Sequence, residues 1–489
     1  MNRQTRGAIA VGIVAFLVRL PAFFAPQTLG FDDGQFAMSV IAMRHGGAPF
    51  KEVFSSQGPL FLPIAWLGDL ITFRQLDSPR TASVLAGVAL AVLVFLIARR
   101  LTTPGAALLT GVLVALSGSV LWTSGPLTSD GIGAALSAAT VLGALAYRST
   151  PTVRRALVVG LLAGAALAVK SLLVIPGLIA AGLWIVSRRR FRDLAVIPVV
   201  GVLTVLAASA PWGLSRVYDQ YVRYHTDAVA ERPIGANATK LFRTLFERDA
   251  PLLAAAIVAL LAGIAFLASR RRRVPGAGAE TAPPSNLETG TSPSRLPVLV
   301  WLVATIAVVL TESPMWRNHV AHVVVPLVIL VGIGLASPRM PAIAATLALL
   351  TAPWAIVHLG EILRPQPASG ITATLEHRLA GLPAGALVIS DTPGLVWRAG
   401  RRVPDRFVDV SILRITSPTR SLVLTGADVI RSAQRPVVCA VVRWSDQRFT
   451  HFPHLGARLR AVGYRVTLRA PHGPEILWVK QSCRPPRSN

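Results

Sequence analysis

The sequence predicts a polytopic α-helical membrane protein that ends in a small α/β domain. Of its 489 residues, 53% are hydrophobic and only 15% are charged, whereas soluble domains carry about 25% charged residues. Several apolar runs are long enough to cross a hydrocarbon core of about 30 Å. Beyond about residue 360, short β-rich segments alternate with helical patterns.

Clusters of arginine between the apolar runs predict the orientation of the spans, because Lys and Arg in short loops mark the cytoplasmic side. They also account for the net charge of +26 without a nucleic-acid partner. The clusters lie at 99–100, 154–155, 188–190 and 270–273. Alternation between them gives about eleven spans, at 7–24, 80–98, 105–122, 127–147, 155–170, 171–187, 194–211, 250–268, 297–311, 318–336 and 340–357.

The segments between the spans divide the chain into two expected domains. The apolar stretch 7–24 is interpreted as an uncleaved first helix, since it has the length of a span rather than of a signal peptide. The membrane domain, 1–357, would have outside loops at 25–78 and 212–249 and a cytoplasmic linker, rich in Pro, Ser, Thr and Gly, at 269–296. The α/β domain, 358–489, would lie outside.

The C-terminal domain is expected to hold four strands with helices between them. Cys439 and Cys483 lack the spacing of metal ligands. Outside the cytoplasm they could form a disulfide, and two buried thiols that never meet are the equal alternative. The basic excess of this domain suits anionic lipid headgroups. The expected strands are 386–390, 436–442, 464–468 and 475–479, and the helices lie near 426–434 and 452–462.

The first outside loop holds the residues most typical of a catalytic site. Asp32 and Asp33 precede an expected amphipathic helix at 37–44, and ionisable residues at a membrane are functional candidates by default. A carboxylate here can take a proton from an acceptor hydroxyl that attacks an activated sugar carbon. The alternative is that the two residues only cap the helix, because Asp is a favoured N-cap.

A series of short motifs runs from the first span through this loop. They are Arg19, Asp32-Asp33-Gly34-Gln35-Phe36-Ala37, Gly46-Gly47, Pro49-Phe50-Lys51-Glu52-Val53-Phe54 and Gln57-Gly58-Pro59-Leu60. The series resembles the first loop of GT-C superfamily glycosyltransferases, notably the bacterial branch of protein O-mannosyltransferases and the aminoarabinose transferase of lipid A. Asp33 stands where that family more often has Glu.

The resemblance implies an activity, its partners and its location. Such an enzyme moves a monosaccharide from a polyprenyl-phosphate donor to an envelope glycan, lipid or protein, with inversion. The transfer takes place at the outer face of the bacterial cytoplasmic membrane. No nucleotide is needed there, and the sequence has neither a P-loop nor a Gly-x-Gly-x-x-Gly motif after a strand.

The resemblance also implies roles for individual residues. Asp32 would be the catalytic base, and Asp33 a second catalytic carboxylate that contacts substrate or a divalent metal ion, if one is used. The departing phosphate needs cations, which Lys170, Arg317, His319 and His322 would supply. Asp130, Gln57 and Arg19 would contact substrate. The alternatives are that Lys170 extends to the interface, Asp130 caps its helix and the histidines only pack.

Two other classes of protein compete with a transferase. A transporter or a flippase of lipid-linked sugars usually shows internal repeats and broken helices at the membrane midplane. The sequence shows no clear repeat, and its charged residues gather at the outer rim. In a non-catalytic scaffold for envelope assembly, Asp32 would be only a cap.

Overall fold

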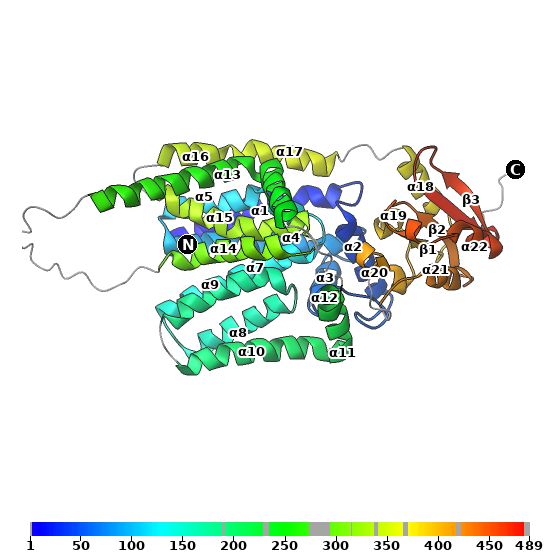
Figure 1. The fold of residues 1–489 in the computed structure, drawn as a ribbon, viewed down its shortest axis with the longest axis horizontal. Coiled ribbons are helices and arrows are strands. Elements are labelled where there is room, and N and C mark those ends of the chain that lie inside the picture. The colour runs from blue at the N-terminus through cyan, green and yellow to red at the C-terminus, as the bar shows by residue number, and fades with distance from the viewer. Residues whose placement is uncertain are drawn as a thin grey trace, which may run out of the picture.

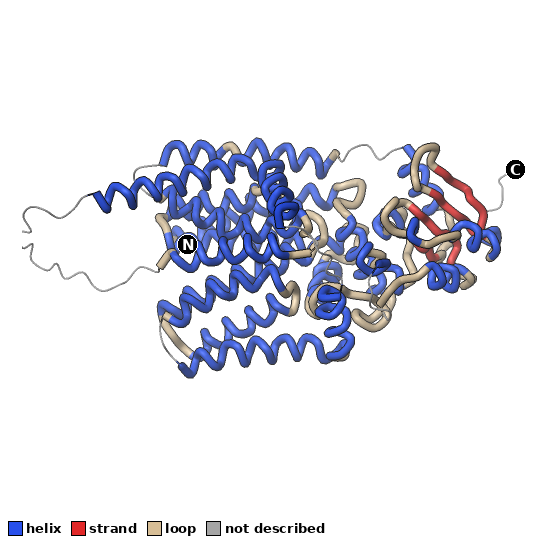
Figure 2. Tube along the Cα trace, viewed as in Figure 1, coloured by secondary structure: helices blue, strands red, loops and turns tan. Residues whose placement is uncertain are grey.

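The computed structural model describes residues 2–187, 191–227, 234–272, 294–313, 315–336, 341–364, 370–416 and 422–483. A helical bundle occupies one end of the elongated molecule and a small sheet with its helices the other (Figure 1). The tube view separates the same two parts (Figure 2). The predicted fold class is thus confirmed in outline. The arginine cluster 188–190 and most of the predicted linker 269–296 lie outside the described residues.

The bundle is built from thirteen described helices. The helices are α1 (Arg3–Leu17), α4 (Thr81–Leu101), α5 (Pro104–Leu116), α6 (Gly118–Ser124), α7 (Ser129–Ser149), α8 (Val153–Leu167), α9 (Ile175–Val186), α10 (Phe191–Ser209), α13 (Ile234–Arg272), α14 (Leu296–Thr311), α15 (Val320–Leu335), α16 (Pro341–Leu349) and α17 (Thr351–Leu363). Consecutive helices such as α7 and α8 are joined by short connections, as in antiparallel bundles, whereas α16 and α17 together form one candidate span.

Each of the eleven expected spans overlaps one or two of these helices, but the number eleven is not confirmed. Within the described part of the chain, six helical segments are long and apolar enough to cross a membrane, and the bent pair α5 and α6 makes a possible seventh. Three further apolar helices are shorter. The protein is a multi-pass membrane protein whose helices differ in length. The proposed domain boundary at 357 falls inside α17.

The two ends of the bundle carry different residues. Helix α4 follows Arg80 and ends with Arg99 and Arg100. Helix α7 has Asp130 in its first turn and Arg148 in its last, and α8 runs from an arginine pair towards Lys170. The arginine pairs therefore lie at one end, and the predicted site residues lie at the other.

The first loop is folded into helices. α2 (Phe31–Arg44) begins six residues before the expected helix, so Asp32 and Asp33 lie in its first turn, and Gly30 is the N-cap. The prediction of an amphipathic helix at 37–44 is wrong, because most residues of α2 are buried, in part under the C-terminal domain. α3 (Phe61–Ile71), which was not predicted, follows.

The predicted outside loop 212–249 is helical as well. It contains α11 (Leu214–Val217), a π-helical turn (η5, Tyr218–Arg223), α12 (Tyr224–Asp227) and the first part of α13. Helix α13 is kinked at Asp249, whose carboxylate accepts hydrogen bonds from the Ser117 hydroxyl at 2.7 Å and the Ser119 amide at 3.2 Å. Asp249 thus provides a hydrogen-bond acceptor for a backbone amide in the first turn of α6, where this helix bends by 58° from α5.

The C-terminal domain has a four-stranded mixed sheet in the order β1-β2-β4-β3. β1 (Leu387–Ser390) is parallel to β2 (Val438–Arg443), while β4 (Ile476–Lys480) pairs antiparallel with β2 and with β3 (Tyr464–Arg469). All four predicted strands are present, and the two predicted helices correspond to α21 (Gly426–Ala433) and α22 (Leu455–Ala461). The domain also contains α18 (Gly370–Ala380), α19 (Pro393–Arg398) and α20 (Ile412–Thr416). Cys439 and Cys483 form a disulfide, which decides between the two alternatives.

The C-terminal domain packs closely on the first loop. A Cβ atom at Gly34 of α2 would lie 2.4 Å from the Cα atom of Gly394 in α19, so the two helices cross where neither residue has a side chain. Trp397 donates its indole N–H to the carbonyl of Leu76 at 2.9 Å, and Arg398 pairs with Asp77 at 2.7 Å. The two predicted domains therefore share an interface beside Asp32.

Gly34→Ala should separate this interface. The added methyl group has no room against backbone, and overpacking of this kind costs about 1–3 kcal/mol. We expect a lower midpoint of thermal unfolding in detergent. Gly182→Ala in α9 is the matched control, because nothing lies within 4 Å of its Cβ position. Equal midpoints for the two variants would contradict the close crossing.

Candidate active site

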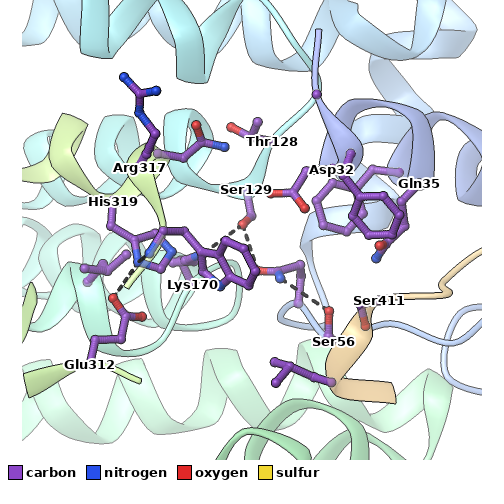
Figure 3. Close-up of a pocket in the computed structure, with 18 of the residues that line it drawn as sticks. Asp32, Gln35, Ser56, Thr128, Ser129, Lys170, Glu312, Arg317, His319 and Ser411 are labelled. Atoms are coloured by element: carbon purple, nitrogen blue, oxygen red, sulfur yellow. Dashed lines mark hydrogen bonds and ion pairs between the residues drawn. The ribbon is translucent and has the colours of Figure 1, made fainter. Parts of the chain in front are cut away.

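A cavity of about 670 Å³ lies where the first loop, the bundle and the C-terminal domain meet. Figure 3 shows its side chains converging from these three parts. From the first loop come Asp32, Gln35 and Gln57; from the bundle end come Ser129, Lys170, Glu312, Arg317 and His319; and from the C-terminal domain come Ser411, Gln447 and Arg448.

Asp32 lines this cavity, and no hydrogen bond or ion pair of its carboxylate is found among the described residues. Burial, and then the neighbouring charge of Asp130, raises the pKa of Asp32 to about 6, against the lowering effect of Lys170 and His319. Asp409 adds a smaller upward effect on this pKa. A carboxylate that keeps its lone pairs free and has a pKa near neutrality suits a general base.

Asp33 lies on a different face of α2, because successive helical residues are about 100° apart. Its carboxylate forms a buried ion pair with Arg80 at 2.6 Å. It also accepts hydrogen bonds from the amides of Leu29 at 2.9 Å and Leu127 at 2.8 Å. Asp33 also borders the cavity, but both of its oxygens are engaged, and these contacts hold the start of α2 in place.

A divalent metal ion does not fit the acidic loop. The oxygens of Asp33, the predicted metal contact, are already satisfied by Arg80 and two amides. In the part of the chain that the structure describes, no group of three or more His, Cys, Asp and Glu residues could hold a metal ion.

Lys170 is held at the wall of the cavity by residues of α7. Its ammonium group lies 3.2 Å from the Asp130 carboxylate and 3.3 Å from the Ser129 hydroxyl. Ser129 in turn donates to the amide oxygen of Gln57 at 2.7 Å. These contacts link the end of α8, the start of α7 and the first loop, and they keep a partly exposed ammonium group facing the cavity.

Arg317 and His319 lie in a 3-10 turn (η6, Arg317–His319) ahead of α15. The Nδ1 atom of His319 is 2.5 Å from the Glu312 carboxylate, and the exposed Arg317 guanidinium pairs with Glu247. His322 lies one turn deeper, buried behind Asp130 at 3.5 Å, and is not among the residues that line the cavity. We therefore assign His322 to positioning Asp130.

Arg19 does not line the cavity either. Its guanidinium is buried inside the bundle, where it donates to the Ser124 hydroxyl at 2.7 Å and to the carbonyls of Ala15 and Ala115. These bonds join the end of α1 to α5 and α6. The predicted substrate contact is thus replaced by a packing role.

Several cavity residues were missed by the sequence analysis. Glu312 had a recognisable signal, since it is an acidic residue between an expected span and the His319 motif. Gln35 was part of the first-loop motif, but no role was assigned to it. Ser411, Gln447 and Arg448 had no signal, because only the fold brings them within reach of Asp32.

Comparisons with known proteins concern the fold of the chain. Residues 56–214 match the family described as dolichyl-phosphate-mannose-protein mannosyltransferase. The structure of ArnT from Cupriavidus metallidurans bound to undecaprenyl phosphate gives a TM-score of 0.64 at 16% identity, with 98% of each chain covered. Its apo structure gives 0.65 at 14% identity, with 99% of this chain and 100% of that chain covered.

The chain shares the overall fold of ArnT. The resemblance expected from the first loop is thereby confirmed. The oligosaccharyltransferase AglB from Archaeoglobus fulgidus matches at a TM-score of 0.48 and 12% identity, over 98% of this chain and 75% of that chain. No curated protein matches by sequence. At these identities the GT-C likeness is one of fold.

The two adjacent carboxylates should respond oppositely to amidation. Asp33→Asn removes the closer of the two carboxylates of Arg80 and leaves Asp77 at 3.1 Å, which Arg80 shares with Arg398. Breaking a buried pair costs up to about 3–5 kcal/mol. Asp32 has a folded pKa above its ordinary 3.8, so its contribution to stability falls as pH rises from 3.8 to about 6.

We therefore expect Asp32→Asn to unfold at the same temperature as the wild type or higher at pH 8, and Asp33→Asn to unfold well below it. The advantage of Asp32→Asn should shrink at pH 5, where the wild-type carboxyl is protonated in the folded state. Differential scanning fluorimetry in detergent checks both. A large loss of stability in Asp32→Asn would contradict the absence of a partner.

Proposed function

We propose that the protein is a glycosyltransferase that moves a monosaccharide from a polyprenyl-phosphate donor to an acceptor hydroxyl. One observation carries the proposal: the unpaired carboxylate of Asp32 and the basic side chains of Lys170, Arg317 and His319 line the same cavity. A base and an anion-binding wall that face one cavity are the two requirements for displacing a phosphate from a sugar carbon.

In the proposed reaction, Asp32 takes the proton from the acceptor hydroxyl as its oxygen attacks the anomeric carbon. The bond between that carbon and the phosphate oxygen breaks, and its electron pair leaves with polyprenyl phosphate. Lys170 and Arg317 neutralise the charge that develops on this oxygen. The Lys170 ammonium acts as a compact point charge, and the planar Arg317 guanidinium can donate two parallel hydrogen bonds. One displacement from the face opposite the phosphate inverts the anomeric configuration.

The donor class is supported by the comparisons and by the location of the cavity. The ArnT structure of the same fold is bound to undecaprenyl phosphate, and the matching family is named for dolichyl-phosphate-mannose. In this chain the cavity lies at the end of the membrane helices, where a lipid-borne phosphate would meet Lys170. The polyprenyl tail would then stay in the bilayer.

The location proposed is the outer face of the bacterial cytoplasmic membrane. Arginine pairs end α4 and begin α8 at the end of the bundle away from the cavity, and such pairs favour the cytoplasmic side. The C-terminal domain and the cavity would then face outward, with the N-terminus inside. The acceptor would be an envelope glycan, lipid or protein.

Transfer can be tested with purified protein in nanodiscs and a panel of radiolabelled polyprenyl-phosphate sugars, with a crude membrane fraction as acceptor. We expect one donor to turn over, and Asp32→Asn to lose about 100-fold or more of the rate, as removal of a general base does. Ser294→Ala, at the start of α14 and far from the cavity in sequence and structure, is the control.

Donor binding without turnover, equal in wild type and Asp32→Asn, would contradict a transferase and favour a flippase.

The rate of transfer should depend on the protonation of Asp32. Because the pKa of this carboxyl is raised to about 6, the base is protonated and inactive below that pH. We expect kcat/KM for the donor to rise from pH 5 to pH 7 with a midpoint near 6, because this ratio reports the ionisation of the free enzyme. Lys170→Met removes a charge that lowers this pKa, so in the residual activity the midpoint should move to higher pH. A pH-independent rate would contradict Asp32 as the base.

A further inference from the structure

A buried hydrogen bond joins the C-terminal domain to the helix that carries Asp32. The amide nitrogen of Gln35 donates to the carboxylate of Asp409 at 2.7 Å. Both side chains are buried, at 4% and 0% exposure. Gln35 lies three residues after Asp32, so both point to the same side of α2. Asp32 and Gln35 are labelled beside each other in the close-up (Figure 3).

This bond fixes the orientation of the Gln35 amide. An ionised carboxylate only accepts hydrogen bonds, so the nitrogen of the amide must face Asp409. The amide oxygen then has one defined position, and it has no hydrogen-bond partner among the described residues. A buried acceptor without a partner is costly and rare in folded proteins. Gln35 is also one of the residues that line the cavity.

Asp409 is itself held in place from several directions. Its other carboxylate oxygen accepts the Ser411 amide at 2.9 Å. Its backbone carbonyl accepts the Arg414 guanidinium at 2.5 Å, and that guanidinium lies 4.3 Å from the centre of the Phe54 ring in the first loop. The carboxylate is therefore a rigid feature of the interface between the domain and the loop.

The cavity has two chemically different sides. Arg317, His319 and Glu312 lie together on one side of Figure 3, and Asp32, Gln35 and Ser411 lie on the other. The lining also includes uncharged polar and aromatic residues, Ser56, Tyr224, Ser411 and Gln447, and the Tyr224 and Ser411 hydroxyls are 2.9 Å apart. Arg448 brings a guanidinium to the Asp32 side, 3.8 Å from the centre of the Phe31 ring. Amides, hydroxyls and aromatic rings suit the hydroxyls and faces of a sugar.

We propose that Gln35 binds the acceptor, its amide oxygen accepting a hydrogen bond from a hydroxyl of a carbohydrate, and that Asp409 is the residue that positions it. The C-terminal domain thereby completes the acceptor subsite of the transferase. This inference rests on the proposed function, since the cationic side takes the donor phosphate and leaves the Asp32 side for the acceptor. It narrows the acceptor class to a glycan or glycolipid sugar.

The test compares three variants in the transfer assay, with octyl glycosides as acceptor probes. Gln35→Met keeps the volume and removes the amide, and Asp409→Leu removes the carboxylate that orients it. We expect each to raise the acceptor KM at least tenfold and to leave the donor KM within twofold. In the double variant the two effects should not multiply, because both variants remove one shared interaction.

Asp428→Asn is the matched control for damage to the domain. Asp428 is a carboxylate of the same domain that caps α21 and pairs with Arg406, and it does not line the cavity. We expect it to lower the unfolding temperature and leave the acceptor KM unchanged. An equal rise in acceptor KM in this control would overturn the positioning role of Asp409.

The outcomes separate this inference from the proposed function. If the wild type transfers sugar and Gln35→Met keeps its acceptor KM, the inference fails and the transferase stands. If the wild type transfers nothing, isothermal titration calorimetry measures whether the same octyl glycosides bind to the wild type and to Gln35→Met. Binding that is lost in Gln35→Met supports the sugar subsite without the transferase, and no binding to the wild type overturns the sugar subsite.

Discussion

Arg80 and Asp33 meet at a buried point where four parts of the chain converge. Besides Asp33, the Arg80 guanidinium donates to the Asp77 carboxylate at 3.1 Å and to the carbonyls of Ala22, after the first helix, and Gln27, ahead of α2. It also lies 5.0 Å from the ring centre of Trp397 in the C-terminal domain. Because an unpaired charge here would be costly, the ion pair fixes how α2 begins, and with it the direction of the neighbouring Asp32.

The cavity around Asp32 also depends on the contact between the membrane domain and the C-terminal domain. The start of α2 packs on α19 through Gly34 and Gly394, and the Arg448 guanidinium lies 3.8 Å from the ring centre of Phe31, next to Asp32. The burial that raises the pKa of Asp32 is therefore produced in part by the C-terminal domain. The C-terminal domain therefore forms part of the wall of the cavity.

Local patterns in the sequence predicted much of this molecule. Apolar runs located the bundle helices, β-branched runs located the four strands, and the first-loop motif pointed to Asp32. The sequence did not separate Asp32 from Asp33, because their difference depends on Arg80, 47 residues away. Nor could it show that Arg19 and His322 are buried behind the cavity, or that residues near 409 and 448 reach it. Those properties arise from tertiary contacts.

The central claim is that Asp32 acts as a base in a single displacement. The anomeric configuration of the first product tests it most directly, by NMR of a product made from a donor of known configuration under single-turnover conditions. The account predicts inversion in every product molecule. Retention would contradict it, because it requires a second displacement through a covalent sugar–enzyme intermediate.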